Sequence, residues 1–224
     1  MRFSLVALML ALGLGGCVDD NISVFILGNI APEVDDEGCS FSPDSNIGIT
    51  QGRWDITGSQ RYAGNYVVNV AVVNQIQARA STVAAEPNGV QISGAEVTLR
   101  DLAGDPIAFG GLPNPFSVPA SVYIPPADGP DNTSSSAVSI VAVPRDYGAS
   151  LMASGTVDTT IVASLRLVGM TNGQIDIRTG EWDFPISICT DCLFGCPPTG
   201  EDAILSCNPG QDDVSLDPST PGCM

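Results

Sequence analysis

Residues 66–74 read YVVNVAVVN, and this stretch decides the class of the fold. Successive side chains of a β-strand point to opposite faces, so the stretch divides into two sets. One face carries a tyrosine and three valines: Tyr66, Val68, Val70 and Val72. The opposite face is also largely apolar: Asn65, Val67, Asn69, Ala71 and Val73. Apolar side chains on both faces predict a strand in the interior of a sheet.

Further strands are predicted on both sides of this stretch. An apolar segment at 22–30 precedes it, and a strand over 90–100 follows the turn signal Asn88–Gly89. In the strand over 90–100, Ala95, Val97 and Leu99 face inward and Glu96, Thr98 and Arg100 face outward. The segment 112–126 contains five prolines. Because proline cannot donate to a ladder, this segment is predicted to be an edge strand or an extended segment that lies over the sheet.

A β-hairpin is predicted near the end of the domain. Its first strand has four inward residues: Ile161, Ala163, Leu165 and Leu167. Asn172–Gly173 is expected to form a type I′ turn, after which Ile175 and Ile177 return. A last strand alternates from Trp182 to Ile188. The pattern of residues 147–152 is ambiguous between helix and strand.

Short strands with glycine- and proline-rich turns predict an all-β fold, an antiparallel β-sandwich with a disulfide-rich C-terminal cap. Four parts are expected: a signal peptide at 1–16, an acidic tether with a short strand at 17–46, the sandwich domain at 47–189, and a cysteine-rich acidic tail packed on it at 190–224. Trp54 and Trp182 are predicted to anchor the core, with a sugar-stacking platform as the alternative.

The first 20 residues, MRFSLVALMLALGLGGCVDD, predict export. Arg2 precedes an apolar run from Leu5 to Leu14, which is too short to span a bilayer. Two glycines and Cys17 follow, and this end resembles the lipobox of bacterial lipoproteins. The resemblance implies cleavage before Cys17 and acyl chains such as palmitate on it. Val18 at the next position favours the outer membrane, and an ordinary signal peptide with an incidental cysteine is the alternative.

The composition excludes several classes of chemistry. The 224 residues include 25 acidic residues and 8 basic ones, all arginine, so loss of Arg2 with the leader leaves a net charge of 7 − 25 = −18. Such a charge disfavours nucleic acid and anionic lipids as partners. The absence of histidine and lysine excludes Ser-His-Asp triads, histidine-bearing zinc sites and Schiff-base chemistry. We therefore expect no enzyme, with no catalytic residues, no metal and no cofactor.

Six cysteines besides Cys17 predict three disulfides, for which fifteen pairings exist: Cys39, Cys189, Cys192, Cys196, Cys207 and Cys223. Five of them lie within residues 189–224, so Cys39 is expected to tie the N-terminal segment to the tail. A four-thiolate zinc site and a thioredoxin-like redox motif at Cys189 and Cys192 are the alternatives.

Four segments resemble lipoproteins of myxobacteria and their relatives: residues 66–74, 94–99 (GAEVTL), 180–192 (GEWDFPISICTDC) and 210–213 (GQDD). Those proteins combine a lipobox, a β-rich domain and a cysteine-rich tail. The strand pattern is also similar to immunoglobulin-like domains of the late-embryogenesis-abundant type. These resemblances imply an envelope location and an immunoglobulin-like antiparallel β-sandwich, and they carry no activity.

Two kinds of acidic site are candidates. Calcium could be held by one of two clusters: Glu33, Asp35, Asp36 and Glu37, or Asp212, Asp213 and Asp217. Neither matches a calcium-binding loop, so acidic linkers are predicted. A glycosidase needs two carboxylates, and six lie near strands: Asp55, Glu96, Asp158, Asp176, Glu181 and Asp183. No pair is selected, and Asp176 with Arg178 is expected to form a surface ion pair.

The function that follows is a lipid-anchored cell-envelope protein with a structural or interaction module that is not catalytic. Its expected partners are the membrane, through the lipid on Cys17, and an envelope protein or glycan. The alternatives are a module that binds a glycan or small ligand through the loops at 101–106 or 127–136, and a carboxylate-dependent hydrolase.

Overall fold

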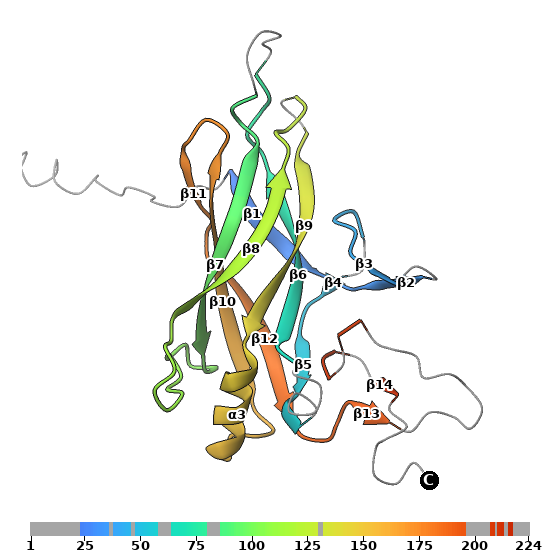
Figure 1. Ribbon diagram of the computed structural model, residues 1–224, viewed down its shortest axis with the longest axis vertical. Helices are drawn as coiled ribbons and strands as arrows, with labels where there is room; N and C mark the ends of the chain where they lie inside the picture. The colour runs from blue at the N-terminus through green and yellow to red at the C-terminus, as the bar shows by residue number, and fades with distance from the viewer. Residues whose placement is uncertain are drawn as a thin grey trace, which may run out of the picture.

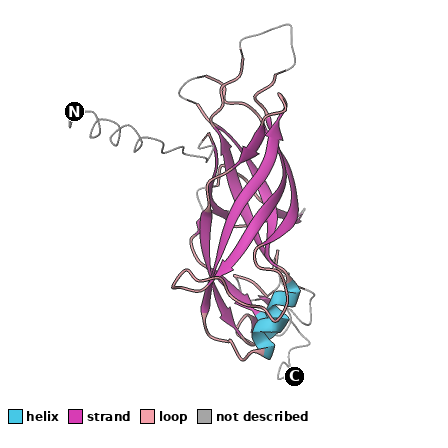
Figure 2. Ribbon diagram, turned by 90° about the vertical axis from the view of Figure 1, so that its left-hand side faces the viewer, coloured by secondary structure: helices cyan, strands magenta, loops and turns pink. Residues whose placement is uncertain are grey.

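The computed structural model describes residues 23–35, 38–45, 48–57, 64–79, 86–129, 132–195, 207–208, 210–212 and 215–216. These residues are mostly in β-strands, which confirms the β-rich class. The long strands run along one axis, and the helix α3 (Arg145–Ala153) lies at one end (Figures 1 and 2). Among the described residues no helix has the length and apolar character needed to cross a membrane.

One sheet has four strands in the order β4 (Gly48–Ile49), β1 (Val24–Ile30), β6 (Tyr66–Asn74) and β9 (Ser134–Val143), and all neighbours are antiparallel. β6 lies between β1 and β9, which confirms its interior position. Both of its faces are buried, since Val70 on one and Ala71 on the other are almost inaccessible. β1 places Val24 and Ile26 in the core.

The second sheet has the order β5 (Gly52–Asp55), β12 (Trp182–Cys189), β10 (Thr160–Thr171), β7 (Val90–Arg100) and β8 (Phe116–Ile124). β11 (Asp176–Arg178) also pairs with β10. β8 is at the edge, as the prolines of segment 112–126 predict. β5 pairs parallel with β12, so the expectation of wholly antiparallel strands is wrong here. The chain passes from β4 in the first sheet to β5 in the second through only two residues, and the pairing is parallel because β5 lies beside β12.

Two small ladders lie outside these sheets in the part of the chain that the structure describes. β2 (Glu33–Asp35) and β3 (Gly38–Ser40) are antiparallel, whereas β13 (Phe194–Gly195) and β14 (Ser215–Leu216) are parallel.

The two sheets curl around one hydrophobic core to which both contribute. Trp54 is 1% exposed and contacts Tyr66 edge-on with ring centroids 6.3 Å apart, so it is a core anchor as predicted. Trp182 is half-buried and stacks on Phe184 at 5.3 Å. Where the sheets meet along β8 and β9, the Ser136 hydroxyl donates to the Tyr123 carbonyl oxygen at 2.9 Å.

α3 covers one end of the core. Tyr147 and Leu151 face inward, and the Tyr147 ring lies 4.8 Å from Phe109 and 4.7 Å from Phe116. A Cβ atom added at Gly148 would lie 2.7 Å from the Trp54 ring, so the absence of a side chain lets the helix approach the indole. The ambiguous segment 147–152 is thus helical.

The turn between β10 and β11 differs from the predicted type I′ turn. Gln174, with φ of 64°, is the left-handed residue of this turn, and neither Asn172 nor Gly173 has a positive φ. The Thr171 amide donates to the Ile175 carbonyl at 2.8 Å, which closes a three-residue loop. The amides of Asn172 and Gly173 instead donate to the carbonyls of Gly89 and Pro87, so contact with the neighbouring segment sets the turn.

Candidate functional site

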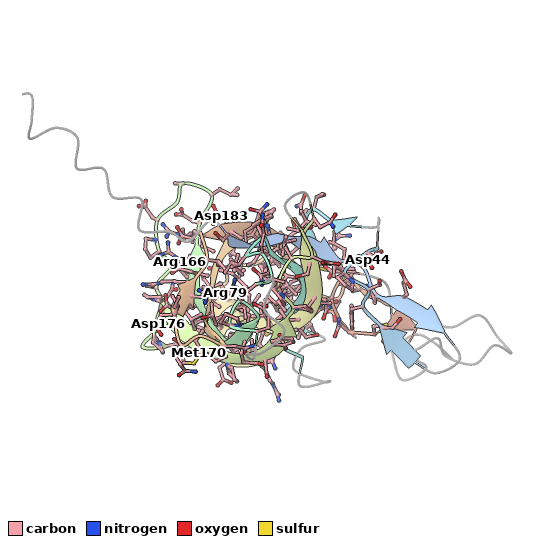
Figure 3. The ribbon with its side chains drawn as sticks, turned by 90° about the horizontal axis from the view of Figure 1, so that it is seen from above. Asp44, Arg79, Arg166, Met170, Asp176 and Asp183 are labelled. Carbon is pink, nitrogen blue, oxygen red and sulfur yellow. A yellow bond between two sulfur atoms is a disulfide. The ribbon has the colours of Figure 1, made fainter. Side chains whose placement is uncertain are left out.

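A polar groove of about 480 Å³ crosses the outer face of the six-stranded sheet. Its lining comes from β7, β8, β10, β11 and the residues beside them: Glu96, Thr98, Pro115, Phe116, Ser117, Ser164, Arg166, Arg178 and Glu181. Figure 3 shows Arg166 on the same side of the molecule as Asp183, opposite Asp44. We call the surface formed by the nine lining residues the groove.

Strand alternation and register place these side chains together. The outward Glu96 of β7 pairs with Ser117 of β8 on one side and Arg166 of β10 on the other. One row along, Thr98 pairs with Ser164, which pairs with Asp183 of β12. The Ser164 hydroxyl donates to the Asp183 carboxylate. Residues far apart in the sequence thus form one polar surface on rigid strands.

Two ion pairs cross the face of β10. Arg178 pairs with Glu96, and Arg100 pairs with Glu181 at 3.0 Å. All four side chains are partly exposed, and such surface pairs stabilise a fold by only about 0–1 kcal/mol each. Their larger effect is to fix the positions of donor and acceptor atoms around the groove.

The charges of the groove balance, although the chain as a whole carries a net charge of −17. Two glutamates and two arginines are among its lining residues, together with three hydroxyl groups. Guanidinium groups donate hydrogen bonds, carboxylates accept them, and hydroxyls do both. Phe116 adds an apolar surface that is half-buried against Tyr147. This combination suits a neutral polar ligand better than a highly charged one.

The six carboxylates considered for hydrolysis do not all meet. Glu96 and Glu181 line the groove and Asp183 adjoins it, whereas Asp158 lies in a turn with φ of 54°. Asp176 pairs across the ladder with Met170. The predicted Asp176–Arg178 ion pair is wrong, because the long Arg178 side chain reaches over β10 to Glu96.

Asp55, the sixth of these carboxylates, has a structural role. Its side chain is fully buried and accepts four backbone hydrogen bonds. Oδ1 accepts from Thr57 and Asp191, both at 3.1 Å. Oδ2 accepts from Cys192 at 2.7 Å and from Leu193 at 3.0 Å. Asp55 therefore holds the chain after β12 in place.

Residues 210–212, which we call the tail clamp, bridge β5 and β6. The Gln211 side-chain amide accepts from the Val67 amide at 2.8 Å and donates to the Val67 carbonyl at 2.7 Å, as a neighbouring strand would. The Asp212 amide donates to the Arg53 carbonyl at 2.8 Å, and its carboxylate accepts from the Arg53 amide at 2.9 Å. The GQD part of the sequence motif thus hydrogen-bonds to one strand of each sheet and links the two sheets.

The Tyr66 hydroxyl donates to the Asp212 carboxylate at 2.6 Å. Burial, the charge of Asp212 and this hydrogen bond all raise the pKa of Tyr66 above its usual value of 10.0. Below pH 10 the Tyr66 hydroxyl keeps its proton in both the folded and the unfolded state, so the stabilisation from its hydrogen bond to Asp212 is fully present.

We expect stability to fall as the pH rises above about 10, by up to about 1.4 kcal/mol per pH unit from Tyr66, because only the unfolded chain then loses this proton. Tyr66→Phe should flatten this part of the profile, whereas Tyr123→Phe, at an exposed tyrosine, should leave it unchanged. Urea unfolding at pH 8, 10 and 11 measures the effect. An equally steep alkaline loss in Tyr66→Phe would contradict the assignment.

The described cysteines form two disulfides, Cys39–Cys207 and Cys189–Cys192. The first ties the N-terminal segment to the tail, as expected. Cys17, Cys196 and Cys223 lie outside the described residues. Within the described part of the chain, no three His, Cys, Asp or Glu side chains gather where they could hold a metal.

The calcium candidates are divided between described and undescribed parts of the chain. Glu33 is exposed on β2, and the Asp212 carboxylate is bound within the tail clamp. Asp36, Glu37, Asp213, Asp217 and the side chain of Asp35 lie outside the described residues.

The two loops proposed for ligand binding do not line the groove. Asp101 closes its own loop, since its Oδ1 accepts from Ala103 at 2.9 Å and from Asp105 at 3.0 Å. The loop at 127–136 is described only in part. The sequence feature that could have revealed the groove is the alternating pattern of residues 90–100, because it places the polar side chains of Glu96, Thr98 and Arg100 on the outer face.

No protein-family model, curated protein or solved structure matches this chain.

Proposed function

We propose that this protein is a lipid-anchored component of the bacterial cell envelope, placed in the outer membrane through Cys17. Its β domain, an immunoglobulin-like sandwich in this proposal, acts as an interaction module and not as a catalyst. The leader sequence and the following Cys17-Val18 support the anchor. The two disulfides support a location in an oxidising compartment.

The observation that carries the interaction role is the groove on the six-stranded sheet. Its lining side chains project from paired strands, and two ion pairs hold four of the charged groups around it in position. Because these side chains are already held in position, ligand binding costs little of their conformational entropy. We therefore assign the groove as the recognition surface.

The anchor is tested by Cys17→Ser, because only a thiol can form the thioether to the lipid. We expect this variant to lose membrane association and to run as an uncleaved or unlipidated chain. Asp20→Asn, three residues further on, is the control and should remain in the membrane fraction. Fractionation and mass spectrometry of both variants measure the outcome, and unchanged membrane association of Cys17→Ser counts against the proposal.

A second candidate, binding of a glycan or a small polar ligand, is favoured by the chemistry of the groove. Alternating guanidinium, carboxylate and hydroxyl groups match the paired donors and acceptors of a neutral, hydroxyl-rich molecule. Glycoside hydrolysis is supported less, because one carboxyl group must then carry a proton. Glu96 and Glu181 are instead each engaged in an ion pair with an arginine.

For this candidate, Arg178→Ala should weaken binding of a neutral oligosaccharide by about tenfold or more, since it removes charged donors worth about 1.5–3 kcal/mol. Arg79→Ala, which changes an arginine outside the groove, should leave binding unchanged. Titration of glucose-based and N-acetylglucosamine-based hexasaccharides, followed by NMR, measures both. No saturable shift at the groove with either sugar, or an equal loss in both variants, contradicts saccharide binding.

A further inference from the structure

We propose that the end of the β domain at which the chain enters faces the lipid bilayer, so that the groove lies toward the end that is farther from the bilayer. This inference rests on the proposed anchor at Cys17.

Several connections lie at the end where the chain enters. The Gln75 amide donates to the Ser23 carbonyl at 2.8 Å, and Val24 pairs with Asn74. The Asn74 side chain donates to the carbonyls of Asn88 and Pro125, before β7 and after β8. The Asn172 amide donates to Gly89, which brings the β10–β11 turn to the same place (Figure 1). We call the end of the domain where these residues lie the entry end.

The length of chain before the domain limits how far the entry end can lie from the membrane. Cys17 and Ser23 are 23 − 17 = 6 residues apart, which spans at most about 21 Å. β7 runs from Val90 at the entry end to Arg100 at the opposite end, 11 residues or about 34 Å. Because the tether is shorter than the domain, the entry end stays close to the bilayer when Cys17 carries the lipid.

Three exposed apolar or aromatic side chains at the entry end suit the interface of a lipid bilayer. Ile175 is 64% exposed, and Tyr123 and Met170 are 45% and 43% exposed. Met170 of β10 and Tyr123 of β8 pair with Gln91 from opposite sides, so these two side chains flank β7 in one row across the sheet. Apolar side chains add binding at the interface of a bilayer. The net charge of the chain without its leader, 7 − 25 = −18, disfavours anionic lipids, so the surface that fits is zwitterionic.

The groove lies toward the opposite end of the same strands. Thr98, Phe116 and Ser164 line it, and each is near the end of its strand that is farther from the entry end. Its charged neighbour Arg100 ends β7. A domain anchored at the entry end therefore presents the groove to partners away from the bilayer surface.

The test uses the lipidated full chain in phosphatidylcholine vesicles with dansyl-labelled head groups. Ile175→Trp places a donor at the entry end, and Leu102→Trp, at a side chain that is 73% exposed, is the matched control at the opposite end. The signal from Trp54 and Trp182 is subtracted with the unmodified chain. Energy transfer from the new tryptophan should be at least roughly threefold larger in Ile175→Trp, given the length of the strands.

Vesicle flotation separates the two proposals. A chain that floats with the vesicles but shows equal transfer from both positions, or more from Leu102→Trp, overturns the orientation alone. A chain that does not float overturns the anchor and the orientation together. Circular dichroism that matches the unmodified chain shows that both variants are folded.

Discussion

Asp55→Ala is expected to lower the free energy of unfolding by about 4 kcal/mol, because a buried acceptor is removed while its donors remain. Four backbone amides point at this carboxylate, and no part of the Asp55 side chain is exposed. Three of these amides, those of Asp191, Cys192 and Leu193, belong to the segment after β12, so their loss should also loosen the chain around the Cys189–Cys192 disulfide.

Two variants set the scale for this prediction. Asp55→Asn keeps the shape and one carbonyl acceptor, so we expect about half of the loss, roughly 2 kcal/mol. Asp44→Ala changes an exposed carboxylate and should stay within about 0.5 kcal/mol of the unmodified protein. Urea unfolding followed by tryptophan fluorescence measures all three. A loss below about 1 kcal/mol in Asp55→Ala would falsify the structural role of this residue.

The strands that alternate strictly were predictable from the sequence, because burial of one face leaves a period of two. β7 covers residues 90–100 as expected, and Ala95, Val97 and Leu99 have no exposed surface. The direction of β5 and the β10–β11 turn were not predictable. Both depend on which segment lies alongside, as the contacts of Asn172 and Gly173 with Gly89 and Pro87 demonstrate.

The groove was predictable only in part. Alternation marks Glu96 and Arg100 as outward residues, but it does not say which strands lie beside β7. The sheet order brings β10 and β11 there, and only then do Arg166 and Arg178 meet Glu96. Neighbours across a sheet are set by topology, which a single alternating pattern does not contain.

The tail clamp shows a second limit. Counting cysteines predicted a bridge from Cys39 to the tail, whereas Gln211 and Asp212 read as part of an acidic linker. Apart from the Tyr66 hydroxyl, the partners described for them in other strands are main-chain groups of Val67 and Arg53, more than a hundred residues away. Backbone groups are present at every position, so no residue type in the sequence marks these contacts.

Removing the Cys39–Cys207 disulfide is expected to cost far more stability than removing Cys189–Cys192. The first closes a separation of 168 residues and the second a separation of 3. In the chain-entropy description these lengths correspond to about 5 and about 1.6 kcal/mol, because a longer loop restricts the unfolded chain more. The double variants Cys39→Ala/Cys207→Ala and Cys189→Ala/Cys192→Ala, unfolded in urea without reductant, measure the difference. Equal losses, or a larger loss in the second pair, would mean that the long bridge adds little beyond what the tail clamp already supplies.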